Sequence, residues 1–251
     1  PVTTEHRTRW RPATRRLWEI SREMGLEPQP LPKLGHYERC TNCGRCVVGC
    51  QHGVKWDSRR LLTEAVRGGA SVVTGCRVER VVTRNGGAVG VEAKRGWRSQ
   101  FYSADLVVLS AGGLGTPAIL ERSGFATEQS LFVDPVLTVA AEREDARQHQ
   151  ELCMPFVVQR DRYILSPYFD YLSFFFNRGW RRPARHTVGI MIKLADGCQG
   201  RVGTNGKVSK VLTDEDRRRL QEGVETCTEM LERLGARRQS IVLGTLNAGH
   251  P

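Results

Sequence analysis

Four of the eight cysteines stand close together in the sequence. They are Cys40, Cys43, Cys46 and Cys50. Their spacing, C-x2-C-x2-C-x3-C, matches the compact run by which bacterial ferredoxins ligate a cluster, although Gln51 stands where those proteins have Pro. A cubane needs several thiolates that converge from one short piece of backbone, and Gly44 and Gly49 permit the left-handed turns that such a wrap requires. The run therefore predicts an iron–sulfur cluster with these four thiolates as ligands.

Two other kinds of site are compatible with part of the run. Structural zinc usually takes two Cys-x2-Cys pairs separated by a longer spacer, whereas here the second pair overlaps the first. Cys43 and Cys46 could form a redox-active dithiol, but that leaves Cys40 and Cys50 without a role. Within the iron–sulfur interpretation, a [4Fe–4S] cluster uses all four thiolates and a [3Fe–4S] cluster leaves one spare.

The length and net charge of the chain limit the classes of protein to which it can belong. The chain has 251 residues, enough for one large domain or two modest ones. The net charge of +11 is spread along the chain without a nucleic-acid-reading motif, so we expect no nucleic acid as partner and favour an acidic protein or an anionic membrane surface. No signal peptide or membrane-spanning apolar run is present. We therefore expect a cytoplasmic protein, with a peripheral place at a membrane as a further option. Because it begins at Pro1 and ends at Pro251, we expect a fragment of a longer protein.

Hydrophobic periodicity and turn residues predict the elements that must position these side chains. Helices are expected over 12–24, from Ser58 to Gly68, after the glycine-rich stretch at 111–115, and over 213–234. Leu61, Leu62 and Val66 of the second helix are expected to face inward. Strands are expected over 70–74, 77–84, 89–94, 106–109, 156–159, 163–165, 187–194 and 240–243, with a hairpin turn at Asn85-Gly86. An aromatic block between Tyr168 and Trp180 is typical of a core or of an apolar pocket.

The glycine-rich stretch carries a resemblance to a family. The segment Ala-Gly-Gly-Leu-Gly-Thr-Pro-Ala-Ile-Leu-Glu-Arg-Ser-Gly, residues 111–124, resembles the second signature of the glucose–methanol–choline (GMC) flavoprotein oxidoreductases. The segments at 59–82, at 200–236 and at 247–251 resemble further parts of the family, in the family's order. The last of these, Asn-Ala-Gly-His-Pro, is similar to the segment with the family's catalytic histidine.

The resemblance implies an FAD-dependent dehydrogenase that oxidises an alcohol. By this resemblance, His250 takes the alcohol proton, and the residues beside FAD are Val78, Ala111, Gly112 and Gly113. Some dehydrogenases of the family hold an iron–sulfur cluster on cysteines spaced x5 and then x3. Cys40, Cys46 and Cys50 reproduce that spacing, and Cys43 is an additional thiol that favours four irons. Electrons would then leave through the cluster to an external acceptor, a protein or a quinone.

The implied fold is α/β, with part of an FAD-binding domain and a substrate domain built on an antiparallel sheet with helices. The expected divisions are an N-terminal helix and linker (1–39), the cysteine run with part of the FAD domain (40–125), the substrate domain (126–239) and the return to the FAD domain (240–251). The family's amino-terminal Gly-x-Gly-x-x-Gly loop and the segment with its second catalytic residue have no counterpart in the sequence. The chain alone is therefore not expected to bind FAD tightly. The alternatives are a ferredoxin-like electron carrier without substrate chemistry and a zinc-stabilised binding module.

Overall fold

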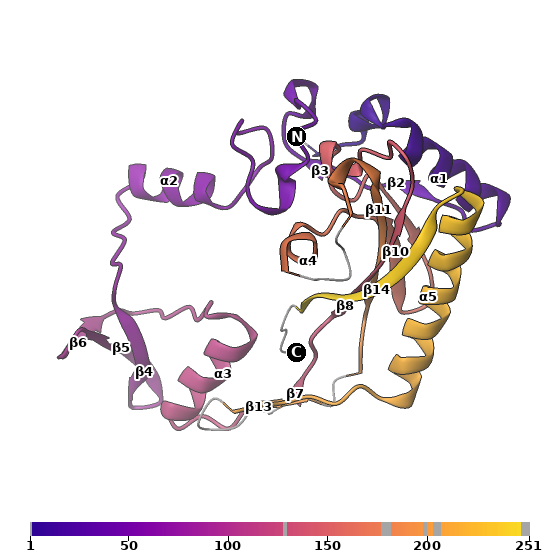
Figure 1. Ribbon diagram of the computed structural model, residues 1–251. Helices are drawn as coiled ribbons and strands as arrows, with labels where there is room; N and C mark the ends of the chain where they lie inside the picture. The colour runs from indigo at the N-terminus through magenta and orange to yellow at the C-terminus, as the bar shows by residue number, and fades with distance from the viewer. Residues whose placement is uncertain (1, 128–129, 177–181, 198–199, 203–206, 247–251) are drawn as a thin grey trace. The chain divides into compact units, whose positions relative to one another are not determined.

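The computed structural model describes residues 2–127, 130–176, 182–197, 200–202 and 207–246 (Figure 1). Its contacts divide the chain into two compact units. Unit 1 comprises Pro1–Ser58, Asp134–Asp196 and Asp214–Leu246, and unit 2 comprises Arg59–Val133, Gly197–Thr213 and Asn247–Pro251. Each unit contains helices and antiparallel strands, which confirms the predicted mixed α/β class.

The units divide the chain at other positions than the predicted domains. The cysteine run belongs to unit 1 because the segment before it is paired with that unit's sheet: β2 (Gln29–Pro30) lies antiparallel to β9 (Phe156–Gln159), and the amide of Leu31 donates to the carbonyl of Pro155 at 3.1 Å. The predicted domains concern the binding of FAD and substrate. They remain predictions.

Unit 1 is built on a six-stranded antiparallel sheet with the order β14-β8-β11-β10-β9-β2. Its remaining strands are β8 (Pro135–Glu142), β10 (Tyr163–Pro167), β11 (Thr187–Leu194) and β14 (Arg237–Leu246). A two-stranded ribbon joins β1 (Val2–Thr3) to β3 (Lys33–Leu34). β11 lies between two partners, and all of its residues except Lys193 are buried, as is typical of a strand covered on both faces. The strands predicted at 156–159, 163–165, 187–194 and 240–243 are confirmed.

Helix α5 (Asp214–Arg233) packs against this sheet, as its apolar stripe predicts. Leu220, Cys227 and Leu231 of the stripe are buried. A Cβ atom at Gly223 would stand 2.8 Å from the side chain of Ile192 on β11, so the absence of a side chain at this position lets the helix approach the strand. Neither α5 nor another helix of the described ranges is long and apolar enough to cross a membrane.

Helix α1 (Pro12–Glu23) confirms the first predicted helix, with Pro12 at its first position. It adds an aromatic cluster to the core, in which the ring of Phe156 lies 5.7 Å from that of Trp10 and 5.4 Å from that of Trp18. The buried carboxylate of Glu151 holds the start of the helix. It accepts hydrogen bonds from the amide of Arg11 at 2.8 Å and from the hydroxyl of Thr14 at 2.6 Å.

Unit 2 contains a three-stranded antiparallel sheet of β4 (Arg77–Arg84), β5 (Gly87–Arg95) and β6 (Arg98–Ser103). The predicted turn at Asn85-Gly86 joins β4 to β5, and both residues have positive φ (50° and 79°). Helix α3 (Gly112–Arg122) confirms the helix predicted after the glycine-rich stretch. A second small sheet contains β7 (Ser130–Leu131), β12 (Gly200–Val202) and β13 (Val208–Ser209).

Three sequence-based expectations in unit 2 are wrong. Residues 70–74 and 106–109 have irregular backbone instead of strands, and Leu106 and Val108 are 79% and 75% exposed instead of buried. The second predicted helix forms as α2 (Arg59–Arg67), but Leu61, Leu62 and Val66 are exposed. An apolar run becomes a strand only beside a partner strand, and within the described residues neither segment has one. Periodicity predicts an apolar face but not the surface that covers it.

The buried carboxyl group of Glu151 gives a testable pH dependence. Burial raises the pKa of Glu151 to about 7. Its ordinary value in the unfolded chain is lower, so the folded protein holds this proton over a pH range in which the unfolded chain has lost it. Stability should therefore fall as pH rises from about 4.5 to about 7, by roughly 3 kcal/mol at most.

Urea unfolding of the full protein at pH 5 and pH 8, compared with Glu151→Gln, measures this contribution. The glutamine keeps a hydrogen-bonding side chain but has no proton to lose. The loss of unfolding free energy between the two pH values should be larger in the wild type than in the variant, and an equal loss in both would contradict the assignment.

Candidate functional site: the cysteine cavity

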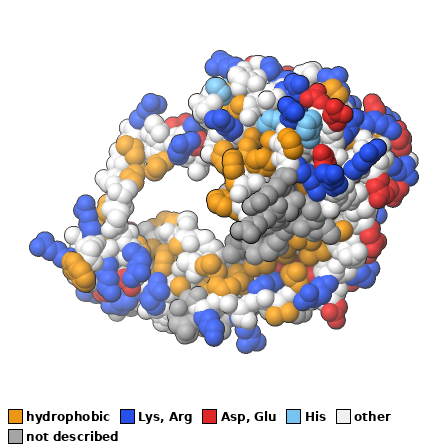
Figure 2. Space-filling model, in the orientation of Figure 1, with side chains coloured by type: hydrophobic (Ala, Val, Ile, Leu, Met, Phe, Trp, Pro, Cys, Tyr) orange, Lys and Arg blue, Asp and Glu red, His pale blue; other side chains and the backbone are white. Residues whose placement is uncertain are grey.

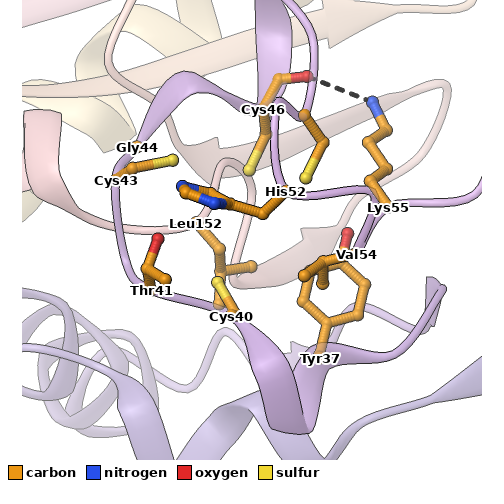
Figure 3. A pocket seen from close by; sticks show the side chains of 11 residues that line it. Tyr37, Cys40, Thr41, Cys43, Gly44, Cys46, His52, Val54, Lys55 and Leu152 are labelled. Atoms are coloured by element: carbon orange, nitrogen blue, oxygen red, sulfur yellow. Dashed lines mark hydrogen bonds between the residues drawn. The ribbon is translucent and has the colours of Figure 1, made fainter.

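The four cysteines of the run line one cavity in unit 1 (Figure 3). The cavity has about 350 Å³, including space open to solvent. Its other lining residues are Tyr37, Thr41, Gly44, His52, Val54, Lys55 and Leu152. Each of the four thiols is partly exposed and none is in a disulfide. The structure thus brings together the four side chains that the sequence singles out as ligands.

The first half of the run is held from the N-terminal segment. Arg9, at the end of the 3₁₀ turn η1 (Glu5–Arg9), donates from its guanidinium to the carbonyl of Cys40 at 2.6 Å. Asn42 has a positive φ of 54° and returns a bond from its side-chain amide to the carbonyl of Arg9 at 3.3 Å. This mutual pair sets the direction in which the chain enters the cavity. Arg9 carries no spacing signal in the sequence.

The far wall of the cavity is a segment paired with β3. The amide of His36 donates to the carbonyl of Val54 at 2.9 Å, and the amide of Trp56 donates to the carbonyl of Leu34 at 3.0 Å. Between them, Gly35 lies opposite Lys55 in a β-bridge. Gly35 has a φ of +140°, and a Cβ atom there would overlap the carbonyl oxygen of Val54, so this pairing requires glycine.

A third contact joins the middle of the run to the turn η4 (Gln148–Gln150). Gly44 has a φ of +71°, and a Cβ atom built on it would overlap the carbonyl oxygen of His149. The same carbonyl accepts a hydrogen bond from the hydroxyl of Tyr171 at 2.7 Å. Tyr171 begins α4 (Tyr171–Phe176), so part of the predicted aromatic block is bonded to the turn that contacts the cysteine run. The sequence predicts the left-handed turn at Gly44 but not the contact of this turn with His149.

Burial and backbone amides act in opposite directions on the thiols. Burial raises the pKa of the Cys40 thiol above its ordinary value. Burial also acts to raise the pKa of Cys50, but hydrogen bonds from the backbone amides of residues 52–55 outweigh it and lower that pKa. Amides that point at one sulfur stabilise its thiolate, which is the form that binds metal. The loop therefore favours a thiolate at the position where the run ends.

Cations also lie close to this wall. The ammonium group of Lys55 donates to the carbonyl of Cys46 at 3.3 Å (Figure 3). Lys33 is half-buried nearby, and its burial lowers its pKa to about 8 although the thiols of Cys153 and Cys46 act to raise it. Positive charge near a sulfur stabilises its thiolate. Lys33, Tyr37 and Leu152 are neighbours of the cavity that no spacing rule indicated.

The cavity does not have the geometry of a site for one metal ion. Within the described residues, no three Cys, His, Asp or Glu side chains are grouped as such a site. The thiolates around a single zinc ion all bind at about 2.3 Å from it and must lie close to one another. The described side chains therefore do not form a site for a single zinc ion.

The residues predicted to contact FAD lie in unit 2. Val78 is on β4, opposite Ala93, and Ala111, Gly112 and Gly113 form the start of α3, where Gly112 has a φ of +75°. Arg122 donates to the carbonyl of Glu79 at 2.8 Å, and the amide of Val81 donates to the hydroxyl of Ser123 at 2.8 Å. These bonds tie the end of α3 to β4. His250, the predicted base, lies outside the described residues.

Comparison with known proteins identifies relatives of the chain. Residues 1–148, more than half of it, match the family model described as GMC oxidoreductase. An uncharacterised GMC-type oxidoreductase of Mycobacterium tuberculosis is 34% identical over 112 residues, which are 44% of this chain and 18% of that protein. A long-chain-alcohol oxidase of Arabidopsis thaliana is 27% identical over 236 residues, with 77% of this chain and 32% of that protein covered. The chain thus spans about a third or less of these relatives.

Two solved structures share its fold. Pyridoxine 4-oxidase from Mesorbium loti superposes with a TM-score of 0.65 at 17% identity, over 90% of this chain and 53% of that one. An FAD-dependent oxidoreductase from Chaetomium thermophilum gives a TM-score of 0.55 at 13% identity, over 90% of this chain and 55% of that one. At these identities the likeness concerns the fold alone.

The contact at Gly44 can be tested by thermal unfolding of the full protein. Gly44→Ala and Gly53→Ala both place a side chain at a left-handed position, with φ of +71° and +63°, which costs about 1 kcal/mol in each. Nothing lies within 4 Å of a Cβ atom at Gly53, whereas at Gly44 it meets the backbone of residue 149. Gly44→Ala should therefore cost a further 1–3 kcal/mol, about the penalty of overpacking. Equal melting temperatures for the two variants would refute this contact.

Proposed function

Because the chain belongs to the GMC oxidoreductase family, we propose that the protein oxidises an alcohol and transfers the hydride to FAD. The name of the Arabidopsis relative, a long-chain-alcohol oxidase, supports an alcohol as the substrate class. FAD, when bound, supplies the hydride acceptor. The fold neighbours include a protein described as FAD-dependent, which supports this cofactor.

The residues of this chain have separate tasks in the proposal. Val78 and residues 111–113 hold FAD, and the bonds between α3 and β4 keep them in one packed piece of unit 2. His250 takes the hydroxyl proton of the alcohol, a task that suits imidazole because its pKa lies near neutral pH. Removal of that proton lets the alcohol carbon give up its hydride.

We further propose that the cysteine cavity holds an iron–sulfur cluster, through which electrons leave for an external acceptor, a protein or a quinone. The observation that carries this proposal is the convergence of four thiols on one cavity, with backbone amides directed at Cys50. A cluster accepts electrons one at a time, which suits a dehydrogenase with a one-electron acceptor. Four thiols favour [4Fe–4S] over [3Fe–4S].

Metal analysis of the full protein, purified without oxygen, tests the cluster. We expect iron and sulfide together with the visible bands of flavin. Cluster without flavin would favour the ferredoxin-like carrier, and zinc without iron would refute both.

Single substitutions then test the ligand set. Cys46→Ser should lose most of the iron, and Cys43→Ser should leave a three-iron cluster, since Cys43 is the thiol additional to the x5 and x3 spacing. Cys76→Ser is the matched control, because its thiol lies in unit 2 beside the hydroxyl of Tyr102 at 3.6 Å. Electron paramagnetic resonance distinguishes the two cluster types. Unchanged iron in Cys46→Ser would contradict the assignment.

The role of His250 is tested by reduction of the flavin. In His250→Ala, stopped-flow reduction by a long-chain alcohol should slow by two to four orders of magnitude, about the contribution of a general base. Flavin and iron content should stay the same. His36→Ala, which removes an exposed imidazole paired with Glu38 at 3.2 Å, is the control and should reduce normally. A wild-type rate in His250→Ala would eliminate this role.

A further inference from the structure

The turn between β5 and β6 carries a tryptophan whose side chain is fully exposed. Trp97 is 104% exposed, so its ring gains nothing from burial in the folded chain. The two-residue turn Gly96-Trp97 needs only the glycine, whose φ is +58°. A small polar residue would serve equally well at the second position. Phe101, farther along β6, is also 54% exposed.

Three cations stand close to this tryptophan along the hairpin. Arg95 and Arg98 lie directly opposite each other at the last register position of the hairpin, and Lys94 precedes them. Like charges in this position destabilise a strand pair. Figure 2 shows Lys and Arg side chains beside hydrophobic ones where Figure 1 places β6.

Two arginines of the same sheet form ion pairs, whereas these three cations do not, although the charge of Lys94 helps to lower the pKa of Glu79. Arg77 pairs with Glu79 at 2.7 Å, and Arg80 pairs with Glu92 at 2.6 Å. In the part of the chain that the structure describes, no carboxylate lies within ion-pair distance of Lys94, Arg95 or Arg98. Among the described residues, Arg84 at the end of β4 is also without such a partner, so what distinguishes the tip is the exposed ring beside its cations.

We propose that this tip, residues 94–98, binds the surface of an anionic lipid bilayer. Tryptophan favours the membrane interface because one part of its ring system is apolar and its N–H is polar. Lysine and arginine at the same depth are attracted by anionic headgroups. A bilayer sets no minimum contact area, since one inserted ring and a few charges already contribute.

Co-sedimentation with vesicles tests this proposal on the full protein. Binding is measured to phosphatidylcholine vesicles with and without phosphatidylserine, at low and high salt. We expect binding only with phosphatidylserine, and weaker binding at high salt. No binding, or equal binding to both compositions, would overturn the proposal.

Substitutions in the hairpin test whether its tip makes the contact with the vesicle. Trp97→Ala and Arg98→Glu should each weaken binding about fivefold or more. Arg217→Glu, which makes the same charge change on the exposed side of α5 in unit 1, is the matched control and should bind like the wild type. If Arg217→Glu weakened binding as much as Arg98→Glu, the attraction would come from net charge and the hairpin would have no special role. Because the assay needs neither flavin nor cluster, its result is independent of the proposed oxidation.

Discussion

Close approach of backbone to backbone around the cysteine run is the constraint on which the site depends. At Gly44 and at Gly35 the chain passes so near to a carbonyl oxygen that a Cβ atom would overlap it. At Gly44 the run lies against the turn at His149. At Gly35 the far wall of the cavity lies against the end of β3. Both partners belong to unit 1, in the turn η4 and in the segment bridged to Gly35. These two glycines therefore set how closely the walls of the cysteine cavity approach each other.

The electrostatics of the cavity follow from that packing. Burial alone would keep the thiols protonated, as the raised pKa of Cys40 illustrates. The same pairing that holds residues 52–55 directs their amides at the sulfur of Cys50 and places Lys55 beside Cys46. Backbone dipoles and one ammonium group thus act against the cost of burial. At Cys50 the amides outweigh that cost and favour the thiolate.

Unit 2 shows a different relation between sequence and surface. Its three-stranded sheet pairs Arg77 and Arg80 with carboxylates, whereas Arg95 and Arg98 at the β5–β6 tip stand beside a fully exposed ring without such pairs. The paired arginines contribute to the sheet itself. The cations of the tip repel each other across the hairpin, which is the reason for the membrane proposal above.

The sequence by itself determined the local structure. Pro12 at a helix start, Asn85-Gly86 at a turn, the stripe of α5 and the cysteine spacing all act over a few residues, so their consequences could be predicted. Tertiary structure decided what each surface meets. The run at 106–109 has strand composition but no partner in the described residues, and α2 exposes its apolar face. The contact between Gly44 and the carbonyl of His149 is a further example. The two residues are more than a hundred positions apart in the sequence, so only the fold could show that they meet.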